Sequence, residues 1–130
     1  MKIGFREMIA AADAEVQSLG VADAARLQAE GSAILVDIRD IRELWRDGMV
    51  EGASHAPRGM LKFWFHPDSP YHKPEFAEDR KYILYCASGW RSALAAKALQ
   101  DMGVPDVAHL DGGFSAWKDA GAPIVAKSKT

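Results

Sequence analysis

Short runs of apolar residues alternate along the chain with stretches whose apolar residues recur at helical spacing. The runs "AILVDI" (33–38) and "YILYCA" (82–87) combine β-branched and aromatic side chains with little polar interruption, which predicts buried strands. Further short strands are predicted at 53–57 and 107–110. The spacing predicts helices over residues 21–30, 41–48, 91–102 and 114–121. This alternation predicts an α/β fold of three layers, with a mainly parallel sheet flanked by helices on both faces.

Two segments depart from this regular alternation. Residues 1–20 predict an N-terminal amphipathic helix that ends at Gly20. Its apolar residues at helical spacing are Phe5, Met8, Ile9, Ala12 and Val16. Residues 58–80 contain Pro67, Pro70 and Pro74 among several aromatic residues, so we expect a short helical start followed by a long ordered loop.

The predicted helix over residues 91–102 is amphipathic. We expect Leu94, Ala98 and Met102 to line its apolar stripe, with Ala95 and Leu99 beside them. Gly103 stands where a left-handed residue commonly ends a helix.

Composition narrows the class of protein. A chain of 130 residues predicts a single domain over 1–130. The 16 basic and 18 acidic residues give a net charge of -2, so we expect no nucleic-acid or membrane partner. The N-terminus lacks the apolar core of a signal peptide, and no run has the roughly 18 apolar residues of a membrane span, so we expect a cytoplasmic protein.

The chain has one cysteine, Cys86, which excludes an internal disulfide, a CxxC redox pair and a site with several thiolate ligands. His66 and His72 lie close in sequence but have no carboxylate or thiolate at ligand spacing. We therefore expect no metal site. His55 and His109 fall on predicted strands, where we expect hydrogen-bonded structural residues.

Cys86 is placed where a parallel sheet binds ligands, at the carboxyl end of a strand and before a helix. Ala87, Ser88 and Gly89 are small, so their backbone N–H groups can curl around one point. Amides at a helix start form an anion site, and the same field favours thiolate over thiol. The pKa of such a cysteine can lie well below its ordinary value of about 8.5, which makes the sulfur nucleophilic. Arg91 adds a positive charge or fixes the loop through its carbonyls. The alternative is that Cys86 is only a small buried hydrophobic residue.

The C-terminal half, "CASGWRSALAAKALQDMGVPDVAHLDGGFSAWKDAGAPI", strongly resembles the rhodanese-like family. "LVDIRD" and "EGASHAP" resemble that family's first core segments, with Asp37, Ile38 and Arg39 matching its aspartate–aliphatic–arginine triplet. The resemblance covers about residues 20–125. Met49 stands where the family often has histidine, and the segment 58–80 is enlarged.

The resemblance implies sulfur transfer of the thiosulfate sulfurtransferase type. Cys86 would attack a thiosulfate-like donor, become a persulfide, and pass the outer sulfur to a thiol, cyanide or a protein acceptor. The substrate cradle implied for this loop comprises Ala87, Ser88, Gly89, Trp90, Arg91 and Ser92. No cofactor or metal is required.

Two other functions stay open. Cysteine phosphatases of related fold have five residues between cysteine and arginine, whereas "ASGW" provides four, which favours the smaller sulfane sulfur over phosphate or arsenate. A non-enzymatic persulfide carrier, or an interaction or regulatory module, would have a similar sequence.

Three further polar residues are expected near this edge of the sheet. Asp37 and Arg39 follow a strand predicted to run parallel to the Cys86 strand, so they support the pocket electrostatically or brace the loop as an ion pair. Arg58 either reaches the mouth of the site or is solvated. Trp90 walls the pocket, presents a partner surface or covers apolar neighbours.

Overall fold

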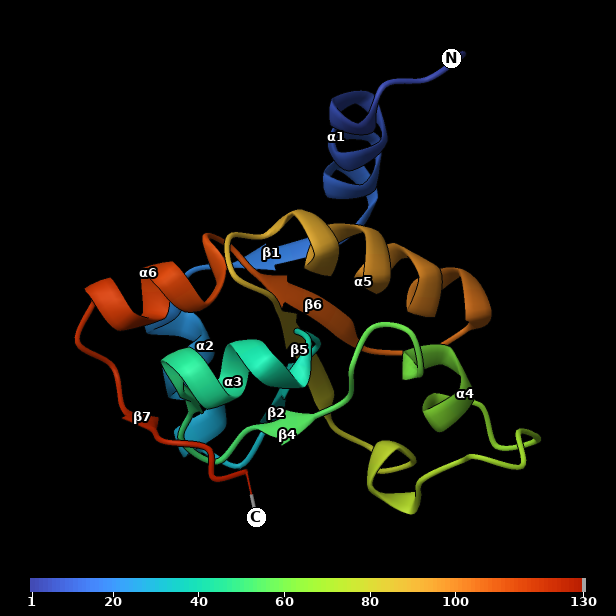
Figure 1. Cartoon of the computed structure of the whole chain (residues 1–130). Coiled ribbons are helices and arrows are strands. Elements are labelled where there is room, and N and C mark those ends of the chain that lie inside the picture. Colours follow the sequence, from blue (N-terminus) through green and yellow to red (C-terminus); the bar gives the residue numbers. More distant parts are fainter. Residues whose placement is uncertain (130) are drawn as a thin grey trace.

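Five parallel strands form the central sheet in the order β1-β6-β5-β2-β4 (Figure 1). The computed structural model describes residues 1–129. The strand bounds are Gln17–Leu19 (β1), Ala33–Asp37 (β2), Ser54–His55 (β4), Lys81–Tyr85 (β5) and Val107–Leu110 (β6). The α/β class and the parallel sheet predicted from the alternation are confirmed.

Helices cover both faces of this sheet. Their bounds are Phe5–Glu15 (α1), Val21–Ala29 (α2), Ile41–Asp47 (α3), Leu61–Phe65 (α4), Trp90–Met102 (α5) and Gly113–Asp119 (α6), with a 3-10 turn at Pro74–Phe76 (η1). On one face, Ala96 and Leu99 of α5 and Phe65 of α4 pack in the same core cluster as Leu84. On the other face, α2 and α6 pack against the sheet, with Trp117 in one cluster with the neighbouring strand residues. Burial on both faces explains why the central strands are almost uninterrupted apolar runs.

The prediction of a helix up to Gly20 is wrong at its C-terminal end. The helix α1 ends at Glu15, and β1 then joins the sheet edge beside β6, with Ser18 opposite His109. A strand of three residues is too short to show an alternating pattern, and its pairing with β6 is a contact between distant parts of the chain. Phe5 and Met8 are about half exposed, and α1 stands out from the body of the molecule in Figure 1.

The stripe predicted for α5 is also displaced. Leu94 and Ala98 are only partly buried, and Met102 is 37% exposed. The buried residues are Ser92, Ala93, Ala95, Ala96 and Leu99, all of them small except Leu99. Small side chains allow the helix to lie close to the sheet, and Leu94 and Met102 lie at the margin of the interface.

A second, two-stranded sheet was not predicted. Met49–Val50 (β3) pairs antiparallel with Ile124–Val125 (β7). Among the helices within residues 1–129, none has the length and apolar character needed to cross a bilayer.

Candidate active site

The carboxyl ends of β2 and β5 meet at one edge of the sheet. Asp37 lies opposite Tyr85 in the register of these parallel strands, and the Ile38 N–H donates to the Tyr85 carbonyl at 3.0 Å. Cys86 follows directly and is 1% exposed. The structure therefore places Cys86 and Asp37 at the same edge of the sheet.

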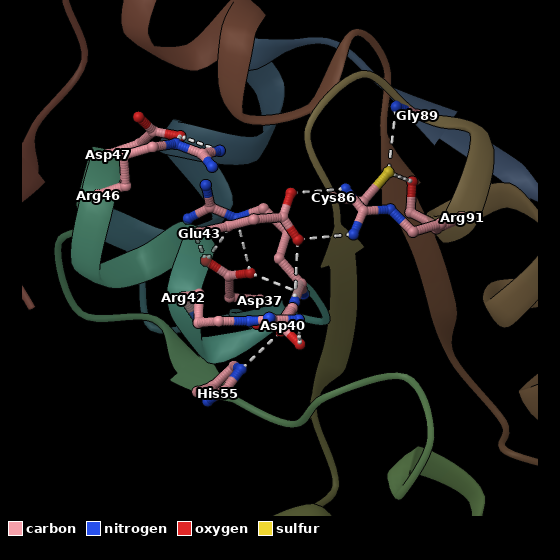
Figure 2. Close-up of polar contacts among 12 residues, drawn as sticks. Asp37, Asp40, Arg42, Glu43, Arg46, Asp47, His55, Cys86, Gly89 and Arg91 are labelled. Carbon is pink, nitrogen blue, oxygen red and sulfur yellow. Dashed lines mark hydrogen bonds and ion pairs between the residues drawn. The ribbon is translucent and has the colours of Figure 1, made fainter.

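The loop after Cys86 wraps around the sulfur. Gly89 adopts a left-handed conformation with φ of 114° and is the N-cap of α5. Its backbone N–H donates to Cys86 Sγ at 3.2 Å (Figure 2). The Ser92 hydroxyl lies 3.6 Å from the same sulfur. The helix starts at Trp90, so Trp90, Arg91 and Ser92 belong to its first turn.

These contacts favour the ionised form of Cys86. Burial of the sulfur opposes ionisation, but hydrogen bonds from the Ser92 hydroxyl and from the backbone N–H groups of Ser92, Gly89 and Ser88 outweigh burial and lower the pKa of Cys86. A lowered pKa of the thiol means that the thiolate is present at pH values where a free cysteine is still protonated.

A pH profile of cysteine alkylation tests this electrostatic environment. The rate constant with iodoacetamide follows the thiolate fraction, so we expect it to fall only when the pH drops through the lowered pKa of Cys86. Its midpoint should therefore lie below about 8.5, the ordinary value for a free cysteine. A profile with its midpoint at or above that value would contradict the assignment.

The start of α6 supports the loop from behind. The Phe114 N–H donates to the Cys86 carbonyl at 2.8 Å, and the Ser115 N–H donates to the Ala87 carbonyl at 3.1 Å. A Cβ atom on Gly113 would lie 2.6 Å from the Cys86 carbonyl oxygen, and Gly113 has a φ of 61°. Gly113 is thus required both for its conformation and for the close approach of the two backbones.

Arg91 forms an ion pair with Glu43, a residue that the sequence analysis did not identify. Its guanidinium donates to both carboxylate oxygens of Glu43, at 2.8 and 3.0 Å, and Figure 2 shows the two groups facing one another. The bond from Arg91 is the main cause that lowers the pKa of Glu43. Glu43 also accepts from the Asp40 N–H in a capping box at the start of α3. The pattern Asp-x-x-Glu after a strand is the sequence signal that could have located this carboxylate.

Asp37 and Arg39 form an ion pair inside the protein. Arg39 Nη2 lies 2.7 Å from Asp37 Oδ2, and both side chains are at most 1% exposed. Arg39 also donates to the Gly48 carbonyl at 2.7 Å and lies 4.3 Å from the centroid of the Phe114 ring. This geometry joins β2 to the start of α6 and is compatible with bracing of the Cys86 loop.

The other predicted residues lie nearer the surface. Ser88 and Trp90 are exposed, and Ala87 is partly buried. The Trp90 ring lies 5.1 Å from the ring of Phe5 in α1. Arg58 is exposed and lines a cavity of about 480 Å³ between α4 and α5 that also includes Phe63 and Leu94.

Comparison with known proteins identifies the family. A family model described as a rhodanese-like domain matches residues 20–120. A sulfurtransferase of Allochromatium vinosum is 36% identical over 78% of this chain and 86% of its own length. An uncharacterized Synechocystis protein, slr1261, is 35% identical over 77% of the chain, which spans only 51% of that relative.

A solved structure from Rhodopseudomonas palustris has a TM-score of 0.92 and 50% identity, with 96% of each chain covered. It is described as a protein of unknown function and possible tyrosine phosphatase. The match to the family model spans most of the chain and includes the Cys86 loop. The chain therefore belongs to the rhodanese-like domain family.

Proposed function

We propose that this protein is a sulfurtransferase that carries sulfane sulfur as a persulfide on Cys86. The main observation behind the proposal is the position of the Cys86 sulfur at the base of a short loop. It lies 3.2 Å from the Gly89 backbone nitrogen and 3.6 Å from the Ser92 hydroxyl oxygen. Hydrogen-bond donors in this arrangement stabilise a thiolate before the reaction and a terminal persulfide anion after it. The similarity to the Allochromatium vinosum sulfurtransferase supports the same function.

The reaction has two balanced steps. The Cys86 thiolate attacks the outer sulfur of a donor such as thiosulfate, the donor's S–S bond breaks, and sulfite leaves with the electron pair. A thiolate or cyanide then attacks the outer sulfur of the persulfide, and Cys86 leaves as a thiolate. Neither step requires an external oxidant or reductant.

The length of the loop argues against phosphatase chemistry despite the description of the Rhodopseudomonas palustris protein. The loop has four residues between Cys86 and Arg91, too few to surround a phosphoryl group as the five-residue phosphatase loop does. A phosphoryl group would therefore not fit within the ring.

Intact mass spectrometry with thiosulfate tests the proposal. We expect the protein to gain one sulfur atom, and we expect cyanide or dithiothreitol to remove it. An unmodified mass together with hydrolysis of p-nitrophenyl phosphate would overturn the proposal in favour of a phosphatase. A stable persulfide with slow cyanide turnover but rapid transfer to a protein thiol would identify a carrier.

Glu43→Gln is expected to lower the KM for thiosulfate about two- to fivefold. The carboxylate neutralises Arg91 and repels an anionic donor, and partly exposed ion pairs of this kind are worth about 0.5–1 kcal/mol. Glutamine retains an oxygen that can accept from the Asp40 N–H. Steady-state kinetics over a range of thiosulfate concentrations measure the effect.

Asp47→Asn is the matched control for that change. Asp47 lies on the same helix and pairs with Arg46 instead of Arg91. Its replacement by asparagine removes the same charge. We expect its KM to stay near that of the unmodified protein. A higher KM in Glu43→Gln would mean that Glu43 is needed to hold Arg91 in place and that repulsion of the donor is not its main effect.

A further inference from the structure

A chain of hydrogen bonds leads from Cys86 through the buried residues Ser92 and His109 to Asp13 on α1. Ser92 Oγ lies 3.6 Å from Cys86 Sγ and 3.0 Å from His109 Nδ1. On the other side of the imidazole, His109 Nε2 lies 3.0 Å from Asp13 Oδ1 and 2.9 Å from Ser18 Oγ. Ser92 is 0% and His109 3% exposed, so the contact between them is shielded from solvent, whereas the Asp13 side chain is 45% exposed.

These hydrogen bonds join residues that the family model matches to a residue outside the match. Ser92 lies in the first turn of α5 and His109 lies on β6, both within the matched residues 20–120. Asp13 lies on α1, outside those residues. The carboxylate at the end of the hydrogen-bond chain is therefore supplied by the N-terminal helix α1.

The chemistry of the donors and acceptors determines where protons can lie. The Asp13 carboxylate only accepts hydrogen bonds, so Nε2 of His109 carries a proton toward it. In neutral His109 the Nδ1 atom is then an acceptor and takes the Ser92 O–H, which leaves the Ser92 oxygen to accept from the Cys86 thiol. For Ser92 to donate to a Cys86 thiolate instead, Nδ1 must be protonated and donate to Ser92.

We propose that His109 takes up the proton of the Cys86 thiol through Ser92, and that Asp13 is a positioning residue that stabilises the resulting imidazolium. The S–H proton passes to Ser92 Oγ as the Ser92 hydroxyl proton passes to His109 Nδ1. The products are a thiolate and an imidazolium whose Nε2–H donates to Asp13. One proton moves along the chain, and the net charge of the site does not change.

Other charged groups lie on the elements packed around this chain. On the thiol side, Arg91 of α5 is paired with Glu43 of α3. Between α5 and α1, Lys97 is paired with Glu15. Asp13 is the carboxylate that contacts the imidazole, and this contact distinguishes it from Glu15 on the same helix.

Asp13→Asn tests the proposal with little change of shape. The asparagine oxygen can still accept from Nε2, but it no longer stabilises an imidazolium by charge. We expect the midpoint of the pH profile of Cys86 alkylation to rise by about one unit, so that the rate falls about tenfold at a pH well below both midpoints. Glu15→Gln removes the same charge from the same helix, and we expect its profile to match that of the unmodified protein.

A second measurement works on the unmodified protein. The ring ¹⁵N shifts of His109 should show both nitrogens protonated where Cys86 is a thiolate, and should show a neutral ring in Cys86→Ser at the same pH. Equal alkylation profiles for Asp13→Asn and Glu15→Gln, or a neutral His109 beside a thiolate, would overturn the proposal and leave His109 as a structural residue.

The inference rests on the proposed role of Cys86 as nucleophile, but its test needs no sulfur donor. A persulfide that forms with thiosulfate although Asp13→Asn has no effect would overturn the relay alone. A shifted alkylation profile without any persulfide would overturn the proposed sulfur transfer and leave the relay.

Discussion

Replacing Cys86 by serine is expected to abolish sulfur transfer, with a loss of at least about a thousandfold in turnover, as for other enzymes that lose their nucleophile. The hydroxyl fits the same space but ionises poorly and cannot form a persulfide. Thiocyanate formation from thiosulfate and cyanide measures the turnover, and intact mass spectrometry reports whether sulfur is bound.

The same substitution separates chemistry from folding. The Gly89 N–H and the Ser92 hydroxyl can still bond an oxygen in place of the sulfur, so the thermal unfolding midpoint should change little. Because the chain has one cysteine, no second thiol can substitute for it. Residual turnover close to that of the unmodified protein would show that Cys86 is not the nucleophile.

The sequence allowed the central part of this site to be predicted because its signals are local. An apolar run, one thiol, three small residues and a helix start are neighbours along the chain, and together they place Cys86 in a loop of backbone donors. The same locality made the main strands and helices predictable, since each carries its own periodicity.

Contacts between distant residues could not be predicted in this way. Glu43 is 48 positions from Arg91, and its pairing depends on the crossover that places α3 beside the loop. The bond between His109 and Asp13 spans 96 positions and needs the three-residue strand β1, which has no periodic signal. From its place on a strand alone, His109 is expected to be structural. Its partners suggest a further role only once the fold brings them together.

Arg39→Ala is expected to destabilise the protein by about 3–5 kcal/mol, because it leaves a buried carboxylate without its ion-pair partner. Asp37 is 0% exposed and accepts from the backbone N–H of Arg39 and from its Nε and Nη2 atoms. The truncation removes the side-chain donors and leaves the charge in place. Urea unfolding measures the change in the free energy of unfolding.

Two comparisons isolate the buried charge as the cause. Arg46→Ala removes an exposed arginine from its pair with Asp47, and we expect a loss below about 1 kcal/mol. The double variant Asp37→Leu/Arg39→Met removes both charges and should recover much of the stability lost in Arg39→Ala. If Arg39→Ala were no more destabilising than Arg46→Ala, the pair would not be a brace. The reactive loop depends on the Asp37–Arg39 ion pair indirectly, because Arg39 packs on Phe114, whose N–H donates to the Cys86 carbonyl.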